Sequence, residues 1–382
     1  MKQSAGIYIG WVGEDNLGDE ALWEVCRSTF RQAQWILWSE LSYRYSASRY
    51  LAHAKRDKRY LLSALAEELW TQQKTRMLIR KLAHAWGSSG GTEVGMLGGG
   101  TLINREDTWL DAYKAIRQRT RRPVMVLGTG VAHPELWVAE PGWLDKRKEW
   151  VALLEELPQV GVRGPVSKHL LEEAGARNVV IAGDPAVALH TPLSGGARPG
   201  EKQQRPRLGM NCGYSGRMWG NASSVLEIQS SLARELSARG WDIDLFAVIP
   251  SELQFCERVA KQAGLDRCGI ELLTSPRAFF HKARTFDLVV AFKLHAGILA
   301  AAANIPFVML EYQPKCRDFA LSIDWERFTI RTDKLTGPNL LDLILSMGEQ
   351  APELQIKLCH SMCALRETFF AYCRKVEPFF QA

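Results

Sequence analysis

Short apolar runs alternate with amphipathic stretches along the first half of the chain. Apolar runs without an alternating polar face are typical of strands that are buried on both faces of a sheet. Strands are predicted at Ile7–Gly10, Trp35–Trp38, Val94–Leu97, Val124–Leu127, Val160–Val162 and Val179–Ile181. Helical patterns separate several of them, for example over Leu144–Leu157 and Val166–Ala174. This alternation indicates a parallel sheet that is covered by helices on both faces.

The alternation restarts after a polar, turn-rich segment at residues 191–206. Further strands are predicted at Leu208–Asn211, Ile243–Val248, Ile270–Leu273, Leu288–Ala291 and Phe307–Leu310, and helices at Val225–Ala238, Leu253–Ala263, Leu294–Ala303 and Glu353–Phe380. We therefore expect an α/β fold with two Rossmann-like domains, at residues 1–190 and 207–350, a linker at 191–206 and a C-terminal helix at 351–382. Ligands of open parallel sheets bind beyond the carboxyl ends of the strands, so the cleft between the domains is the expected active site.

Composition narrows the class of function. The 382 residues include 48 Lys and Arg against 42 Asp and Glu, which gives a formal net charge of +6. This mild excess excludes a dedicated nucleic-acid arm but suits an anionic substrate. The sequence has no apolar run of about 18 residues and no apolar core of a signal peptide near its start, so we expect a cytoplasmic protein without a membrane span.

The eight cysteines are scattered through the chain, which is not the dense framework of a small secreted domain. Free thiols in a reducing compartment are expected. Cys359 and Cys363 have helical i,i+4 spacing, but two ligands do not complete a zinc site. Buried helix cysteines are the interpretation that we adopt, and no metal site is predicted.

The segment Gly10–Glu20 joins the first predicted strand to the first helix. Its glycines allow a close backbone approach to a ligand, and the helix N-terminus offers free N–H groups. Asp15 and Asp19 place negative charge in this turn, which disfavours a phosphate. Together with Asn16, they indicate either helix capping and turn geometry or recognition of sugar hydroxyls.

Two glycine clusters follow the next strands of the first half. Gly98–Gly100 comes after one strand, and Gly128 and Gly130 come after another. Each cluster is either a tight turn or a stretch of backbone N–H groups that lines a ligand. His133 follows the second cluster closely and is either a surface residue or a residue of the site.

Charged side chains mark three more predicted strand ends. Arg163 precedes a helix N-terminus, where it suits either an anionic ligand or a structural salt bridge. Lys293 and His295 open a helix of small residues. Histidine suits proton transfer near neutral pH, although it could instead fill the turn. Glu311, Tyr312 and Lys315 follow the next strand and combine an acid, a phenol and a base.

Together these segments resemble the polysaccharide pyruvyl transferase family, from Ile7 to about Phe319. The motifs that carry the resemblance are Asn16-Leu17-Gly18-Asp19-Glu20, Gly98-Gly99-Gly100, Gly128-Thr129-Gly130, Val162-Arg163-Gly164-Pro165-Val166-Ser167, Asp184-Pro185, Lys293-Leu294-His295-Ala296 and Tyr312-Gln313-Pro314-Lys315. Two positions depart from the family pattern. Lys293 stands where the family has arginine, which keeps the charge but loses the bidentate fork. Gly164 stands where the family has an acid.

The resemblance implies a fold similar to that of the two-domain (GT-B-like) glycosyltransferases. It also implies transfer of the enolpyruvyl group of phosphoenolpyruvate to two hydroxyls of a saccharide, which gives a cyclic pyruvate ketal and phosphate. His295 is then the expected general acid. Arg163, Lys293 and the two glycine clusters are expected to bind the donor. The acceptor-side candidates are Asp15, Asn16, Asp19, His133, Glu311, Tyr312 and Lys315.

The resemblance implies phosphoenolpyruvate as a substrate and no cofactor. Two other readings stay open: a nucleotide-sugar glycosyltransferase with the same architecture, and a non-catalytic member marked by Lys293 and Gly164. The basic runs at Lys55–Arg59 and Arg117–Arg122 are either solvated helix faces or contacts to an anionic membrane that carries a lipid-linked acceptor.

Overall fold

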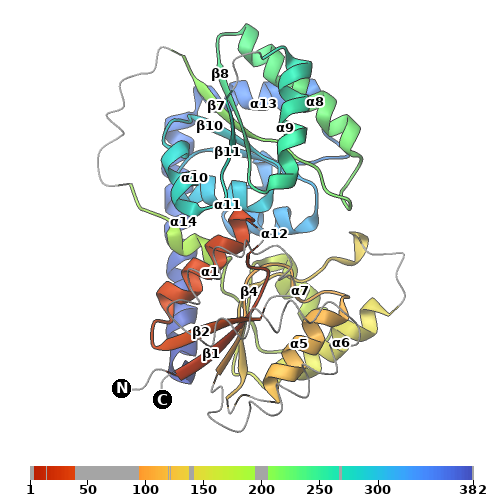
Figure 1. Cartoon of the computed structure of the whole chain (residues 1–382), viewed down its shortest axis with the longest axis vertical. Coiled ribbons are helices and arrows are strands. Elements are labelled where there is room, and N and C mark those ends of the chain that lie inside the picture. Colours follow the sequence, from red (N-terminus) through yellow and green to blue (C-terminus); the bar gives the residue numbers. More distant parts are fainter. Residues whose placement is uncertain are drawn as a thin grey trace.

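Two parallel six-stranded sheets organise the chain, one in each half (Figure 1). The computed structural model describes residues 4–13, 15–38, 94–118, 120, 122–136, 142–193, 205–265 and 269–380. The basic run Lys55–Arg59 lies outside these residues, as does most of the predicted linker.

The first sheet has the strand order β2-β1-β3-β4-β5-β6, and every pairing is parallel. Its strands are β1 (Ser4–Ile9), β2 (Ala33–Trp38), β3 (Val94–Leu97), β4 (Val124–Thr129), β5 (Val160–Val162) and β6 (Val179–Ile181). The described helices of this half are α1 (Leu17–Thr29), α5 (Asp107–Arg117), α6 (Trp143–Leu154) and α7 (Pro165–Glu173), with 3₁₀ turns η2 (Pro134–Leu136) and η3 (Pro185–Leu189). Strands β3, β4 and β5 are buried along their whole length, as expected for a sheet with helices on both faces.

The second sheet has the order β12-β11-β10-β7-β8-β9, again parallel throughout. Its strands are β7 (Arg207–Asn211), β8 (Asp242–Ala247), β9 (Ile270–Leu272), β10 (Leu288–Ala291), β11 (Phe307–Glu311) and β12 (Thr329–Arg331). The helices are α8 (Ala222–Ala238), α9 (Leu253–Ala263), α10 (Pro276–Ala283), α11 (Leu294–Ala302), α12 (Pro314–Ser322), α13 (Gly337–Glu349) and α14 (Ala351–Val376), with 3₁₀ turns η4 (Pro250–Glu252), η5 (Glu326–Phe328) and η6 (Glu377–Phe380).

The strand orders identify where each sheet can hold a ligand. Chain order reverses between β1 and β3 in the first sheet and between β7 and β10 in the second. At such a reversal the connections leave on opposite faces, which opens a crevice beyond the carboxyl ends of the strands. The turn after β1, the glycines after β3, Asn211 after β7 and Lys293 after β10 stand at these two positions.

Helix α11 packs closely in the second half because its residues are small. Apart from His295, all its residues are buried. A side chain at Gly297 would collide with Met309, so the helix lies directly against β11. This close packing fixes the N-terminus of α11, where Lys293 and His295 stand.

Helix α14 returns from the second half to the first and runs beside both (Figure 1). The Tyr372 hydroxyl accepts a hydrogen bond from the Gly161 N–H at 3.1 Å and donates to the Val126 carbonyl. Beyond α14, Phe380 packs against the rings of Phe30 and Trp35. Phe380 and η6 therefore belong to the core of the first half.

The strands that the hydrophobic pattern predicts are all present, with ends that shift by at most a few residues. The pattern missed β12, a three-residue edge strand, as well as α10 and α13. Within the part of the chain that the structure describes, no helix combines the length and hydrophobicity needed to cross a bilayer. In the second basic run, Arg117 pairs with Glu156, and Arg122 donates to the Phe379 carbonyl.

Candidate active site

His295 stands where the two halves meet. It lies in the first turn of α11, and its Nδ1 atom rests so close to Gly18 that any side chain at position 18 would overlap the ring. Its Nε2 atom lies 3.6 Å from Oδ2 of Asp184. The side chain is 14% exposed. Gly18 and Asp184 belong to the first half and His295 to the second, so the contact joins the two domains.

Asp184 lies between His295 and Arg163. It is fully buried after β6, where Oδ1 accepts the Ala186 N–H at 3.0 Å and Oδ2 accepts Nε of Arg163 at 3.0 Å. Burial opposes ionisation of this carboxyl, but His295, Arg163 and the Ala186 amide outweigh it and lower its pKa. Asp184 therefore stays negative between Arg163 and His295. The sequence motif contained Asp184, but nothing in the pattern assigned it a role.

The Arg163 guanidinium makes its hydrogen bonds to other groups of the protein. Its side chain is 1% exposed. Besides the bond to Asp184, NH1 donates to the Thr101 hydroxyl at 3.4 Å and NH2 to the Gly100 carbonyl at 2.6 Å. All three nitrogens thus contact the first half of the chain. This geometry matches the structural salt bridge that the sequence left open as the alternative to a donor ligand.

The predicted glycines allow close packing around this group. Gly128 has φ +63°, and a side chain there would collide with the Gly183 carbonyl. A side chain at Gly130 would occupy the place of the Arg163 guanidinium. Similarly, Gly98 and Gly99 make room for neighbouring side chains, and Gly100 has φ +102°. Packing and turn geometry therefore account for these glycines without a ligand.

Two lysines gather around Tyr312. The Lys293 Nζ atom lies 5.5 Å from the centroid of the Tyr312 ring, and the Lys315 Nζ atom lies 5.0 Å from it. The ring itself stacks on Phe292, with centroids 4.9 Å apart. Burial, with added repulsion from Lys293 and Arg163, lowers the pKa of Lys315 to about 8. Within the described residues, Lys315 has no carboxylate within ion-pair distance.

Lys293 is held by groups that no sequence motif marked. Its Nζ atom donates to the Tyr214 carbonyl at 3.1 Å and lies 3.5 Å from Oε1 of Glu252. The backbone N–H of Lys293 donates to the side chain of Asn211 at 2.8 Å. Glu252 is buried, and burial raises its pKa although Lys293 opposes the shift. Only its position after β8 could have marked Glu252 from sequence.

Each of these lysines stands at a helix N-terminus: Lys293 is the cap residue of α11, and Lys315 lies in the first turn of α12. Strands β10 and β11 are neighbours, and α11 and α12 start directly beyond them. Neither helix has a side-chain cap. Gln313, the cap residue of α12, instead donates to the Arg217 carbonyl. Uncapped N-termini with two amines beside them make a strongly anion-attracting site.

The turn after β1 is built by its own side chains. Asn16 caps α1 by accepting the Gly18 N–H at 3.0 Å, and Glu20 accepts the Gly13 N–H at 3.1 Å. Asp15 has φ +53°. Asp19, in the first turn of α1, acts electrostatically on Tyr312 and Lys315. Capping thus accounts for Asn16.

Two acceptor-side candidates have their contacts elsewhere. Glu311 is buried 4.0 Å from Arg317, and its pKa rises to about 7 because burial outweighs the attraction of Arg317 and Arg331. His133 accepts the Glu135 N–H within its own turn, and burial lowers its pKa. The structure does not bring either residue into contact with His295.

The departure at Gly164 has a structural reason. Asp318 of α12 accepts the backbone N–H groups of Val166 and Ser167, at 2.8 and 3.2 Å, and the Ser167 hydroxyl at 2.6 Å. A side chain at Gly164 would collide with Asp318. The carboxylate at the N-terminus of α7 therefore comes from the second half of the chain instead of from position 164.

Comparison with known proteins agrees with this architecture. The model of the polysaccharide pyruvyl transferase family matches residues 16–314. Among solved structures, a glycosyltransferase from Rickettsia africae is similar over 100% of both chains, with a TM-score of 0.60 and 11% identity. Alr3699/HepE from Anabaena, solved with UDP-glucose, is similar over 98% of both chains, with a TM-score of 0.58 and 10% identity. A putative UDP-N-acetylglucosamine 2-epimerase from Listeria monocytogenes covers 94% of this chain and 91% of its own, with a TM-score of 0.55 and 12% identity.

These structures share the fold, and they confirm two Rossmann-like domains arranged as in the two-domain glycosyltransferases. No curated protein matches the sequence.

Proposed function

The chain belongs to the polysaccharide pyruvyl transferase family, and from this premise we propose that it transfers the enolpyruvyl group of phosphoenolpyruvate to two hydroxyls of a saccharide. The products are a cyclic pyruvate ketal and phosphate. One observation carries the proposal. The His295–Asp184 pair stands at the start of α11, and α11 and α12 have uncapped N-termini that bear lysines.

The donor is a compact anion with a carboxylate and a phosphate. Lys293, Lys315 and the N-termini of α11 and α12 provide the matching positive groups. We assign Lys315 to the donor side, although the sequence suggested the acceptor side, because it lies with Lys293 around Tyr312. Arg163 is buried beneath this site, where it donates hydrogen bonds to Asp184 and to the Gly100 carbonyl and holds both in place.

Protonation of the donor begins the proposed reaction. His295 as an imidazolium gives a proton to the methylene carbon, and C2 becomes an oxocarbenium-like centre. Asp184 stabilises the imidazolium and fixes the ring, while Gly18 lets the ring lie at the domain junction.

The first saccharide hydroxyl then attacks C2 and loses its proton. Phosphate leaves with the electron pair of its bond to C2, and the second hydroxyl attacks the same carbon and loses its proton. One proton has entered the new methyl group and two have been released, and phosphate or solvent takes up the excess. Asp19, in the first turn of α1, is our candidate to receive a hydroxyl proton.

Calorimetric titration of phosphoenolpyruvate into the purified protein tests the donor assignment. We expect saturable binding, weakened about tenfold or more in Lys293→Met and in Lys315→Met, because each variant removes a charge-assisted contact. Lys334→Met, at an exposed lysine, is the matched control and should bind as the parent does. His295→Gln should also keep its donor affinity, since the proposed role of His295 is proton transfer.

UDP is the comparison ligand. Binding of UDP without phosphoenolpyruvate would overturn the proposal in favour of a nucleotide-sugar glycosyltransferase. Binding of neither ligand would favour a non-catalytic member.

We further propose that the acceptor is a lipid-linked saccharide. A cytoplasmic protein would meet it at the inner face of the membrane, because the net charge of +6 favours an anionic surface.

A further inference from the structure

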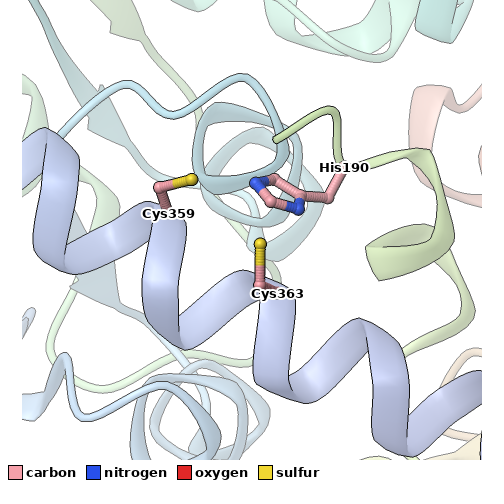
Figure 2. Close-up of side chains that lie close together, drawn as sticks. All are labelled: His190, Cys359 and Cys363. Atoms are coloured by element: carbon pink, nitrogen blue, oxygen red, sulfur yellow. The ribbon is translucent and has the colours of Figure 1, made fainter. Parts of the chain in front are cut away.

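A histidine and two cysteines converge away from the candidate active site. His190 directly follows η3, and Cys359 and Cys363 stand one turn apart on α14 (Figure 2). One ring nitrogen and the two Sγ atoms all lie within 4.8 Å of one another. Their i,i+4 spacing puts both cysteines on one face of α14, which is the face that meets His190. Sequence showed only two of these three ligands, because His190 is far away along the chain.

The hydrogen bonds of His190 leave one nitrogen without a partner. Nε2 lies 2.8 Å from Oδ1 of Asn304, and the amide of Asn304 is oriented by donating to the Thr191 carbonyl at 2.8 Å. The amide oxygen therefore faces the ring, so Nε2 carries the proton and Nδ1 carries a lone pair. His190 is only 3% exposed, and Nδ1 has no hydrogen-bond partner among the residues that the structure describes. A buried, unsatisfied acceptor is costly unless something binds it.

The two thiols complete a soft, nitrogen-and-sulfur donor set. Cys359 is buried and Cys363 partly buried. Zinc binds cysteine as the thiolate, so each thiol proton is released to solvent when the ion binds.

We propose that His190 Nδ1, Cys359 Sγ and Cys363 Sγ bind one Zn²⁺ ion, with a water molecule as the fourth ligand. Zinc prefers a tetrahedral set of sulfur and nitrogen ligands at about 2.0–2.3 Å, so the three donor atoms need to draw together by about 1 Å. Asn304 supplies the outer hydrogen bond that orients a metal-binding histidine. The site joins the end of the first half, the turn after α11 and helix α14, and we infer that the ion holds these segments together.

Cobalt substitution tests the site on the full chain. Reduced, chelator-treated protein is titrated with Co²⁺ while near-ultraviolet thiolate-to-cobalt charge transfer is recorded, and Zn²⁺ is then added in competition. We expect one ion per chain, charge-transfer bands that Zn²⁺ abolishes, and a melting temperature that rises with Zn²⁺. In the parent protein, Zn²⁺ should also slow alkylation of Cys359 and Cys363, mapped by mass spectrometry, which needs no variant.

Variants assign the ligands. The double variant Cys359→Ser/Cys363→Ser should lose the bands and the thermal response to Zn²⁺, and His190→Gln should bind at least tenfold more weakly. Cys373→Ala, on the same helix but outside the cluster, should bind as the parent does. If the reduced parent protein takes up no metal, the proposal is overturned. This holds whether or not the protein as isolated contains a Cys359–Cys363 disulfide. Unchanged uptake in the double variant overturns it as well.

Discussion

At the scale of single residues, the candidate site depends on contacts that cross between the two halves of the chain. His295 could be found from sequence, because it follows a buried strand and opens a helix. Its contacts with Asp184 and Gly18 could not, because those residues belong to the other half of the chain and no periodicity relates them. The same holds for Glu252, which reaches Lys293 from a different strand end.

Lys315 gives the first prediction, which concerns pH. Its pKa is lowered to about 8, so the amine loses its charge as pH rises through that value. Affinity for phosphoenolpyruvate should therefore fall by about tenfold between pH 7 and pH 9.5. Lys315→Arg keeps its charge over this range and should show a flatter profile in the same calorimetric titration. Parallel profiles for the two proteins would mean that Lys315 does not meet the donor.

Arg163 gives the second prediction, which separates a structural role from a binding role. Arg163 and Asp184 form a buried ion pair, and removal of Arg163 leaves the buried carboxylate without its guanidinium partner. Arg163→Met should therefore lower the free energy of unfolding by about 3–5 kcal/mol, measured by urea denaturation. Donor affinity of the remaining folded protein should change little. Loss of donor binding at unchanged stability would instead make Arg163 a ligand, as its sequence position also allowed.

At the scale of secondary-structure elements, the hydrophobic pattern predicted the strands well because buried parallel strands are uniformly apolar. It missed β12 because Thr329-Ile330-Arg331 is a short, half-buried edge strand with one apolar residue. It also gave no reason for the departure at Gly164. That reason appears only when α7 and α12 are seen to meet, so that Asp318 caps a helix of the other half.

Gly164 gives the third prediction, which concerns the packing of α7 against α12. Gly164→Asp restores the acid of the family pattern but places a side chain against Asp318. We expect a loss of about 1–3 kcal/mol in the free energy of unfolding, from the steric clash and from repulsion between two carboxylates. Gly216→Ala is the control, because nothing lies within 4 Å of the position of its added carbon atom. A Gly164→Asp variant as stable as this control would contradict the proposed origin of the departure.

At the scale of the whole molecule, helix α14 connects the second half of the chain back to the first. The sequence predicted this helix but not the sheet against which it packs. Tyr372 is the side chain through which this last helix bonds the first sheet, because its hydroxyl bridges the backbones of β4 and β5. Tyr372→Phe leaves the Gly161 N–H and the Val126 carbonyl without this partner. We expect it to lower the free energy of unfolding by about 1–3 kcal/mol.

Hydrogen exchange distinguishes this coupling from a local defect. Because the lost bonds lie in the first sheet, amides of β4 and β5 should exchange faster in Tyr372→Phe, whereas those of β7 and β8 should keep their protection. Thr368→Val is the matched control, since its hydroxyl lies on the same helix but is exposed and bonds only within the helix. Faster exchange confined to α14 itself would show that the first sheet holds without the helix. Faster exchange in the first sheet, with β7 and β8 still protected, would mean that the first domain depends on its bonds to α14 and can open without the second.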